Sequence, residues 1–294
     1  MSPDTSGVTF HTPSTLDEAF ALLKTHGDDA RVIAGGTALV VMMKQSLVVV
    51  DHLVSLASIP GLASVEVRDG ALHIGALTRH RDVETSPIVR EHLPFLSDVY
   101  GRVATVRIRN SATVGGGLAH ADPSQDPPAA LMVLDARVRL VSPRGEREVA
   151  VADLFRDYYE TVLRSDELIA EVIVPIPAAA ARTVYLKFLP RTEDDYATVA
   201  VAALAEVDGG PGGTVRKLRV TLIAAGPTPV RAEAVEAALE RQSPTAEAIR
   251  AAAELVAGAV DPMDDFRGAP DYKRDMAVVF TRRALERVLL GAQG

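Results

Sequence analysis

Cysteine is absent from this chain of 294 residues. The chain therefore forms no disulfide, and it holds neither a thiolate zinc site nor a cysteine-ligated iron–sulfur cluster. Tryptophan is absent too, and the formal net charge is −8, so the chain lacks the aromatic platform and the basic field that nucleic acids require. No apolar run is long enough to cross a bilayer, and the first residues lack the features of a secretion signal. We expect no nucleic-acid partner, no transmembrane segment and a cytoplasmic location.

The seven histidines also lack the spacing of a familiar metal site. No H-E-x-x-H motif occurs, no two histidines stand four residues apart, and His73 and His80 do not form a ligand pair. We therefore expect no metal site. His120 lies in a turn-like stretch, where a structural role is more common than proton transfer.

The residues that are present are typical of a globular protein long enough for two domains, with 48% hydrophobic and 24% charged residues. A Pro- and Ala-rich stretch near 175–181 predicts a linker between domains at 1–176 and 182–290. After it, three strands precede three helices, which is the α+β pattern. The predicted strands cover 184–189, 198–207 and 215–225, and the helices lie near 230–240, 244–258 and 271–289.

Two glycine-rich segments carry the strongest local signal. The first is AGGTAL at 34–39, and the second begins TVGGG at 113–117. Glycine permits positive φ and a close approach of a ligand to the main chain, and consecutive N–H groups can converge on an anion. Either segment alone is more typical of a tight turn, but together they favour a two-sided cradle for a pyrophosphate. Neither has the G-x-G-x-x-G or the P-loop pattern.

Asp126 has two interpretations, which do not exclude each other. It precedes Pro127, as a helix N-cap often precedes proline. It is also a carboxylate that could accept hydrogen bonds from the hydroxyl groups of a bound nucleotide's ribose or ribityl chain.

Several ordered motifs together resemble the flavin-binding medium subunit of the molybdenum hydroxylases, the group of xanthine dehydrogenase and carbon monoxide dehydrogenase. The resemblance covers essentially the whole chain. It implies an α+β fold: a two-lobed FAD-binding domain of the vanillyl-alcohol oxidase type, with lobes at about 1–60 and 61–176, followed by a C-terminal domain with a three-stranded antiparallel sheet and a three-helix bundle. The motifs are TPSTLDEA (12–19), AGGTAL (34–39), GALTRHRDVE (75–84), ATVGGGLAHADPSQDPPAALMVLDARVRL (112–140), DELIAEVIVP (166–175) and YLKFLPRTEDDYATVAVAALAEV (185–207).

The resemblance also implies which residues bind FAD. Backbone N–H groups of the two glycine segments would hold the cofactor from both lobes, and Asp126 would touch it. Leu168 and Ile169 would pack beside the isoalloxazine, and Lys187 would stabilise the negative charge of the reduced flavin. No catalytic residue is expected on this chain. The implied set is Ile33, Ala34, Gly35, Gly36, Thr37, Ala38, Leu39, Ala112, Thr113, Gly115, Gly116, Asp126, Leu168, Ile169 and Lys187.

The sequence departs from the family pattern at two positions. Gly117 stands where the family often has asparagine, so one side-chain contact to the cofactor is missing or replaced. Ala38 stands where an acidic or hydroxyl residue is common. Backbone contacts survive both changes.

The function implied is that of one subunit in a larger complex. Molybdenum cofactor and [2Fe-2S] clusters would lie on a large and a small partner subunit, and FAD on this chain would pass electrons to NAD⁺, a quinone, a carrier protein or oxygen. One alternative is a stand-alone FAD-dependent oxidase of the same fold. Another is an assembly module that has lost its cofactor, although the intact glycines at 35, 36, 115 and 116 argue against it.

Overall fold

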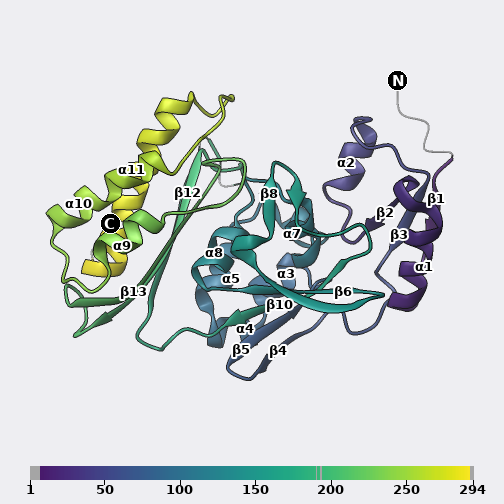
Figure 1. Cartoon of the computed structure of the whole chain (residues 1–294), viewed down its shortest axis with the longest axis horizontal. Coiled ribbons are helices and arrows are strands. Elements are labelled where there is room, and N and C mark those ends of the chain that lie inside the picture. The colour runs from purple at the N-terminus through teal and green to yellow at the C-terminus, as the bar shows by residue number, and fades with distance from the viewer. Residues whose placement is uncertain (1–6, 190, 193, 292–294) are drawn as a thin grey trace.

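The computed structural model describes residues 7–189, 191–192 and 194–291, which build three main sheets in chain order (Figure 1). The N-terminal sheet lies at one end of the molecule, the five-stranded sheet in the middle, and the C-terminal sheet with its helices at the other end. Among the described residues, no helix combines the length and the apolarity that a membrane crossing needs.

The first lobe, which contains the elements from β1 to β3, is a three-stranded parallel sheet with strand order β1-β3-β2 and one covering helix. That helix begins at Thr15, whose hydroxyl oxygen accepts the N–H of Glu18 at 3.2 Å and so caps the first turn. Its buried residues Ala19 and Phe20 pack in one core cluster with Val54. The elements are β1 (Thr9–His11), α1 (Leu16–His26), β2 (Ala30–Ile33), α2 (Leu39–Lys44) and β3 (His52–Ser55).

The second lobe, which contains the elements from β4 to β10, has an antiparallel sheet with strand order β4-β5-β10-β6-β7. Asp-Gly between two apolar runs predicts a hairpin turn, and Asp69 and Gly70 both have positive φ and form the turn between β4 and β5. Helices α3, α4, α5, α7 and α8 build a core with this sheet, with Tyr100 fully buried inside it. The strands are β4 (Val65–Arg68), β5 (Ala71–Gly75), β6 (Arg137–Ser142), β7 (Gly145–Ala150) and β10 (Leu168–Pro175), beside the small pair β8 (Phe155–Asp157) and β9 (Glu160–Thr161). The helices are α3 (His80–Thr85), α4 (Pro87–His92), α5 (Pro94–Gly101), α6 (Val106–Arg109), α7 (Val114–His120) and α8 (Pro127–Val133).

The C-terminal sheet contains the three predicted long strands and one additional short strand at its edge. Its order is β11-β12-β13-β14, and every pair is antiparallel. The added strand is only two residues long, too short to show a hydrophobic period in the sequence. The elements are β11 (Arg182–Phe188), β12 (Val199–Asp208), β13 (Thr214–Ile223), β14 (Val230–Arg231), α9 (Glu233–Leu239), α10 (Ala246–Glu254) and α11 (Pro270–Leu285), which continues into a π-helical turn (Glu286–Leu290).

Strand β12 is buried on both faces, which explains its nearly unbroken apolar sequence. Val199 and Val201 belong to the core shared with the C-terminal helices, whereas Ala200 and Ala202 belong to the core of the second lobe. Successive side chains of a strand point to opposite faces. One face of the sheet therefore packs on the helices of the second lobe, and the other face packs on the C-terminal helices. The second lobe and the C-terminal part therefore share a hydrophobic core.

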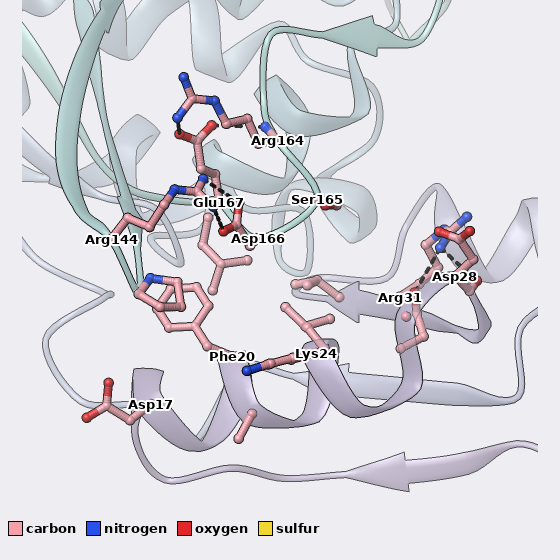
Figure 2. A pocket seen from close by; sticks show the side chains of 17 residues that line it. Asp17, Phe20, Lys24, Asp28, Arg31, Arg144, Arg164, Ser165, Asp166 and Glu167 are labelled. Atoms are coloured by element: carbon pink, nitrogen blue, oxygen red, sulfur yellow. Dashed lines mark hydrogen bonds and ion pairs between the residues drawn. The ribbon is translucent and has the colours of Figure 1, made fainter.

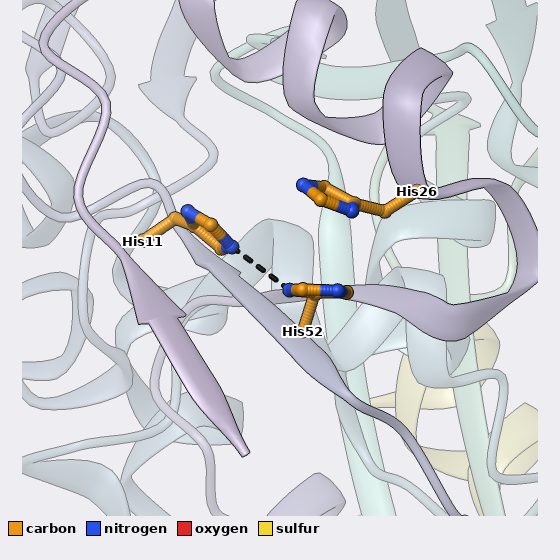
Figure 3. A group of neighbouring side chains, drawn as sticks. All are labelled: His11, His26 and His52. Atoms are coloured by element: carbon orange, nitrogen blue, oxygen red, sulfur yellow. Dashed lines mark hydrogen bonds between the residues drawn. The ribbon is translucent and has the colours of Figure 1, made fainter. Parts of the chain in front are cut away.

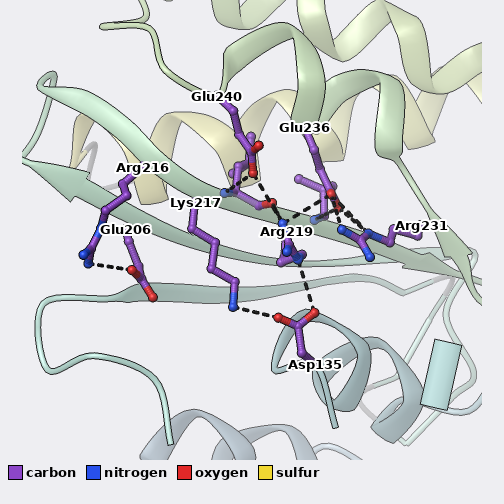
Figure 4. Close-up of polar contacts among 10 residues, drawn as sticks. Asp135, Glu206, Arg216, Lys217, Arg219, Arg231, Glu236 and Glu240 are labelled. Carbon is purple, nitrogen blue, oxygen red and sulfur yellow. Dashed lines mark hydrogen bonds and ion pairs between the residues drawn. The ribbon is translucent and has the colours of Figure 1, made fainter. Parts of the chain in front are cut away.

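Ion pairs reinforce the junction between the second lobe and the C-terminal sheet (Figure 4). Asp135, just after α8, accepts from Lys217 Nζ at 2.7 Å and from Arg219 Nε at 3.2 Å. Both cations lie on β13, and Arg219 also reaches Glu240 at 3.3 Å. The network ties the end of α8 to the sheet that covers it.

Candidate functional site

The two glycine-rich segments meet in space, although about 80 residues of chain separate them. A Cβ atom on Gly35 would overlap the carbonyl group of Ser111 and lie 3.0 Å from the Cα of Ala112. A Cβ on Gly116 would lie 3.6 Å from the Cβ of Ala34. Only glycine permits the approach at position 35, so the first lobe and the second lobe make backbone contact there.

The first segment offers a row of free backbone donors. Ile33 ends β2, Leu39 begins α2, and Gly36 turns the chain between them with φ of +70°. Within the described part of the chain, the N–H groups from Ala34 to Leu39 donate no hydrogen bond. The helix that follows also lacks a side-chain cap, since Ala38 stands at its N-cap. Such a turn fits an anionic group, because an anion would satisfy the donors and the helix dipole.

The second segment has a different geometry from the first. Its glycines lie in the first turn of α7 and not in a loop. The N–H of Gly115 donates to the Ala76 carbonyl at 2.8 Å, and the N–H of Gly116 donates to the Thr113 hydroxyl at 3.2 Å. The two segments are therefore not equivalent amide donors. Here glycine serves close packing, because a Cβ on Gly115 would lie 2.5 Å from the Cβ of Ala76.

Asp126 occupies the N-cap position of α8, as its place before proline predicts, but its side chain does not cap the helix. Its backbone is already helical, with φ of −68° and ψ of −43°, and its side chain makes no capping bond. The buried carboxylate instead accepts hydrogen bonds from the Tyr185 hydroxyl and from Lys187 Nζ, the latter at 3.0 Å. Tyr185 and Lys187 stand two apart on β11, so both side chains point to the same face. Tyr185 opens the motif at 185–207 but is not among the implied FAD-binding residues, and its Y-x-K spacing with Lys187 is the signal that could have found it.

Burial is the main cause of the pKa shifts of Asp126 and Tyr185 in this cluster. Burial raises the pKa of Asp126 above its usual range, and the Lys187 ammonium and the hydrogen bonds from Tyr185 and Lys187 offset only part of this rise. Burial, together with the Asp126 carboxylate, also raises the pKa of Tyr185 well above its ordinary value, so the phenol stays protonated and donates. The side chain of Lys187 is only 4% exposed, and its ammonium also donates to the Arg102 carbonyl at 3.1 Å. The carboxylate partner reduces the net positive charge that Lys187 could offer to a reduced flavin.

Leu168 and Ile169 begin β10 and point to opposite faces of its sheet. Leu168 packs in the core of the first lobe and Ile169 in that of the second, and each is 6% exposed. The Ala170 carbonyl accepts the Ala76 N–H at 2.9 Å, and the Ala76 carbonyl in turn accepts from Gly115. The structure thus brings this strand beside the second glycine segment, but it does not place both side chains on one surface.

His80 and Gln125 lie beside Gly117, at the position of the missing asparagine, and the Tyr100 ring contacts His80 edge-on. Among the described residues, both ring nitrogens of His80, the Tyr100 hydroxyl and the Gln125 amide nitrogen have no hydrogen-bond partner. Burial lowers the pKa of His80 to about 4, so its ring is neutral at physiological pH. A Cβ on Gly117 would lie 3.2 Å from Gln125 Oε1 and 3.5 Å from His80 Nε2. Buried polar atoms without partners are costly, so this region fits a polar ligand or an ordered water.

A cavity of about 1380 Å³ lies elsewhere between the two lobes (Figure 2). Its walls are α1 and β2 on one side and the loops around Arg144 and Arg164 on the other. Leu168 reaches this cavity, but neither glycine segment lines it. The candidate site therefore lies at the two glycine segments, and this cavity is a separate feature.

Comparison with known proteins agrees with this geometry. Residues 6–177 match the family model for the FAD-binding domain in molybdopterin dehydrogenase, and residues 184–288 match that for the CO dehydrogenase flavoprotein C-terminal domain. The chain belongs to the family of FAD-binding medium subunits of molybdenum hydroxylases. It is therefore an FAD-binding oxidoreductase subunit of the kind that works in a multi-subunit complex.

Individual relatives of this medium subunit match over nearly its whole length. It is 35% identical to the carbon monoxide dehydrogenase medium chain of Hydrogenophaga pseudoflava, over 94% of this chain and 95% of that one. It is 27% identical to a putative xanthine dehydrogenase FAD-binding subunit of Escherichia coli, over 97% of each chain. A solved carbon monoxide dehydrogenase from H. pseudoflava, which lacks the Mo-pyranopterin moiety of its cofactor, superimposes with a TM-score of 0.93 and 36% identity, covering 98% of each chain.

Proposed function

We propose that this chain passes electrons from iron–sulfur clusters of a small partner subunit, through FAD, to an external acceptor. The substrate would be hydroxylated at molybdenum in a large partner subunit, and the acceptor would be NAD⁺, a quinone, a carrier protein or oxygen. The observation that carries this proposal is the row of unpartnered N–H groups from Ala34 to Leu39 beside the backbone contact of Gly35 with Ser111. These donors would give the family's cofactor an anion site at the junction of the two lobes.

Each part of the site has a proposed task. The N–H groups of residues 34–39 would bind the pyrophosphate, because the dipole of α2 adds to their partial charges. The buried helix turn from Ala112 to Gly116 would close on the cofactor from the second lobe, and the Thr113 hydroxyl keeps a proton to donate. FAD itself supplies the redox chemistry, since it takes up electrons and gives them back.

The remaining predicted residues would shape the surroundings of the flavin. We propose that Leu168 and Ile169 exclude water from its neighbourhood, since both are buried at the start of β10. Asp126 and Lys187 would act together as a paired dipole, because their charges lie 3.0 Å apart. We also propose the division into a cofactor-binding part at 1–176 and a C-terminal part at 182–290.

The partner subunits follow from the residues that this chain lacks. With no cysteine, it offers no thiolate to a [2Fe-2S] cluster, so the clusters and the molybdenum cofactor would lie on partner chains. These partners and the choice of acceptor remain proposals, supported by the family and by the composition of the chain.

Native co-purification tests the proposed assembly. The chain is purified from its native host through a removable affinity tag, and flavin content and partner chains are measured after the tag has been cleaved. We expect about one FAD per chain, together with two further chain types that carry iron and molybdenum. A yellow chain that purifies alone and oxidises an alcohol or amine without partners would show the stand-alone oxidase instead. A colourless chain that cannot be reconstituted with FAD would contradict both readings.

A further inference from the structure

Three histidines that are distant in the sequence gather on one side of the first lobe (Figure 3). His11 ends β1, His26 ends α1 and His52 begins β3. Strands β1 and β3 run parallel with Thr9 opposite His52, so His11 and His52 point to the same face. Helix α1 covers that face and runs back toward the start of β3, which brings His26 over His52.

The ring nitrogens are already close to the spacing of metal ligands. His11 Nε2 lies 3.1 Å from His52 Nδ1, and one ligand nitrogen from each of the three rings lies within 4.8 Å of the others. In a tetrahedral zinc site with Zn–N bonds near 2.1 Å, two ligand nitrogens are about 3.4 Å apart. The rings of His26 and His52 are stacked, with centroids 3.7 Å apart, so a modest turn of His26 about its side-chain bonds would complete the set.

We propose that His11, His26 and His52 form a binding site for a divalent transition-metal ion such as Zn²⁺. Three imidazoles are a ligand set that suits zinc, nickel and copper, and a fourth position would remain open to water or another donor. All three rings are only partly buried, so an ion can reach them. The spacing of histidines along the chain did not reveal this cluster, because its members stand at 11, 26 and 52.

The proposed metal site is separate from the proposed FAD site. His52 is opposite Ala30 in the sheet, and the first glycine segment begins at Ala34, about 13 Å further along β2 at 3.3 Å per residue. The ion would join β1, α1 and β3. Strand β3 pairs with β2, and β2 leads directly into the first glycine segment. Metal that binds only the folded lobe raises its thermal stability, so we expect Zn²⁺ to raise the unfolding temperature of the chain.

Equilibrium dialysis of the full, tag-free chain against Zn²⁺ tests the proposal, with bound metal counted by elemental analysis. We expect one ion per chain, and a loss of affinity above about 100-fold in His52→Ala, because even outer-shell changes cost 10- to 100-fold. The matched control is His92→Ala, which removes an exposed histidine of α4 outside the cluster and should bind Zn²⁺ normally.

A second variant separates loss of ligand from loss of fold. His26→Gln alters the last residue of α1, where the exchange leaves the helix intact, and it should also lose the ion while keeping a normal circular dichroism spectrum. Substoichiometric binding by the wild-type chain would overturn the proposal. So would unchanged binding by the His11→Ala/His26→Gln/His52→Ala chain, and either result would leave the FAD assignment untouched.

Discussion

The Cα of Gly35 lies directly against the backbone carbonyl of Ser111, at the point where the first and second lobes meet. Neither backbone can yield cheaply, because Gly35 follows β2 and the Ala112 carbonyl beside Ser111 accepts the His80 N–H at 2.9 Å. We predict that Gly35→Ala forces the lobes apart at a cost of about 1–3 kcal/mol, as overpacking does elsewhere. FAD affinity should fall about tenfold or more.

Fluorescence titration of the apo chain with FAD measures this effect. Gly258→Ala is the matched control, because a Cβ there meets nothing within 4 Å and the backbone has no positive φ. Equal FAD affinities for the Gly35→Ala and Gly258→Ala chains would show that the contact between the lobes does not shape the cofactor site.

Substituting alanine for Gly115 or Gly117 of α7 should change the stability of the fold in opposite directions. A Cβ on Gly115 would lie 2.5 Å from the Cβ of Ala76, so Gly115→Ala must displace backbone and lower stability by about 1–3 kcal/mol. A Cβ on Gly117 would meet the movable end of Gln125 at 3.2 Å and would make ordinary van der Waals contact with the His80 ring at 3.5 Å. Gly117→Ala should therefore stabilise the helix by up to about 1 kcal/mol. Urea unfolding of both variants checks the sign, and equal effects would contradict the difference in packing.

The pair of Asp126 and Lys187 should behave as one coupled unit. Lys187→Met leaves a buried carboxylate without its cation, and we predict a loss of about 3–5 kcal/mol in the free energy of unfolding. Replacing both residues, as Asp126→Asn with Lys187→Met, should cost clearly less than the sum of the single changes. A double-mutant cycle by urea unfolding measures the coupling. Strict additivity would mean that the two side chains do not interact in solution.

Glu167 gives the fold a predictable sensitivity to acid. Arg147 donates to both of its carboxylate oxygens at 2.7 Å, and these bonds lower the pKa of Glu167 from 4.5 to about 2. A lowered pKa adds stability above the unfolded value of 4.5 and loses it as pH falls toward 2. We predict that Glu167→Gln costs about 1.5–3 kcal/mol near pH 7, and that this cost shrinks between pH 4.5 and 2.

Chemical unfolding across that pH range compares the Glu167→Gln chain with the wild type. Glu91→Gln serves as the control, since Glu91 is an exposed residue of α4. If the difference between wild type and Glu167→Gln stays constant down to pH 2, then the ion pair does not set the pKa of this carboxylate.

Local signals in the sequence predicted much of the fold. The turn at Asp69 and Gly70, the three long C-terminal strands and the three helices after them all appear in the structure. These features depend on residues close together in the chain, such as a turn dipeptide or an apolar period. The segment at 113–117 was predicted as a glycine turn, because glycine permits positive φ and a close approach to the main chain. It is helical because the helix packs against Ala76. Ala76 is distant in the sequence, so the helix propensity of the segment does not predict this contact.

The polar part of the site depends on long-range contacts and was harder to predict. Asp126 has the local pattern of a cap, yet its partners Tyr185 and Lys187 stand about 60 residues further along the chain. His80, Gln125 and Gly117 lie close together but belong to α3, to the turn before α8 and to α7, respectively. The sequence identified the family of the site from its motifs, but the packing of these side chains required the structure.

Anaerobic mixing with a reduced iron–sulfur partner tests the central claim most directly. The small subunit that co-purifies with the chain is reduced with dithionite, freed of excess reductant, and mixed with the FAD-loaded chain while the flavin absorbance is followed. We predict that the flavin bleaches, and that adding an electron acceptor restores its colour. Flavin that stays oxidised with the reduced partner, but bleaches when the chain alone receives an alcohol or amine, would contradict the role in electron transfer.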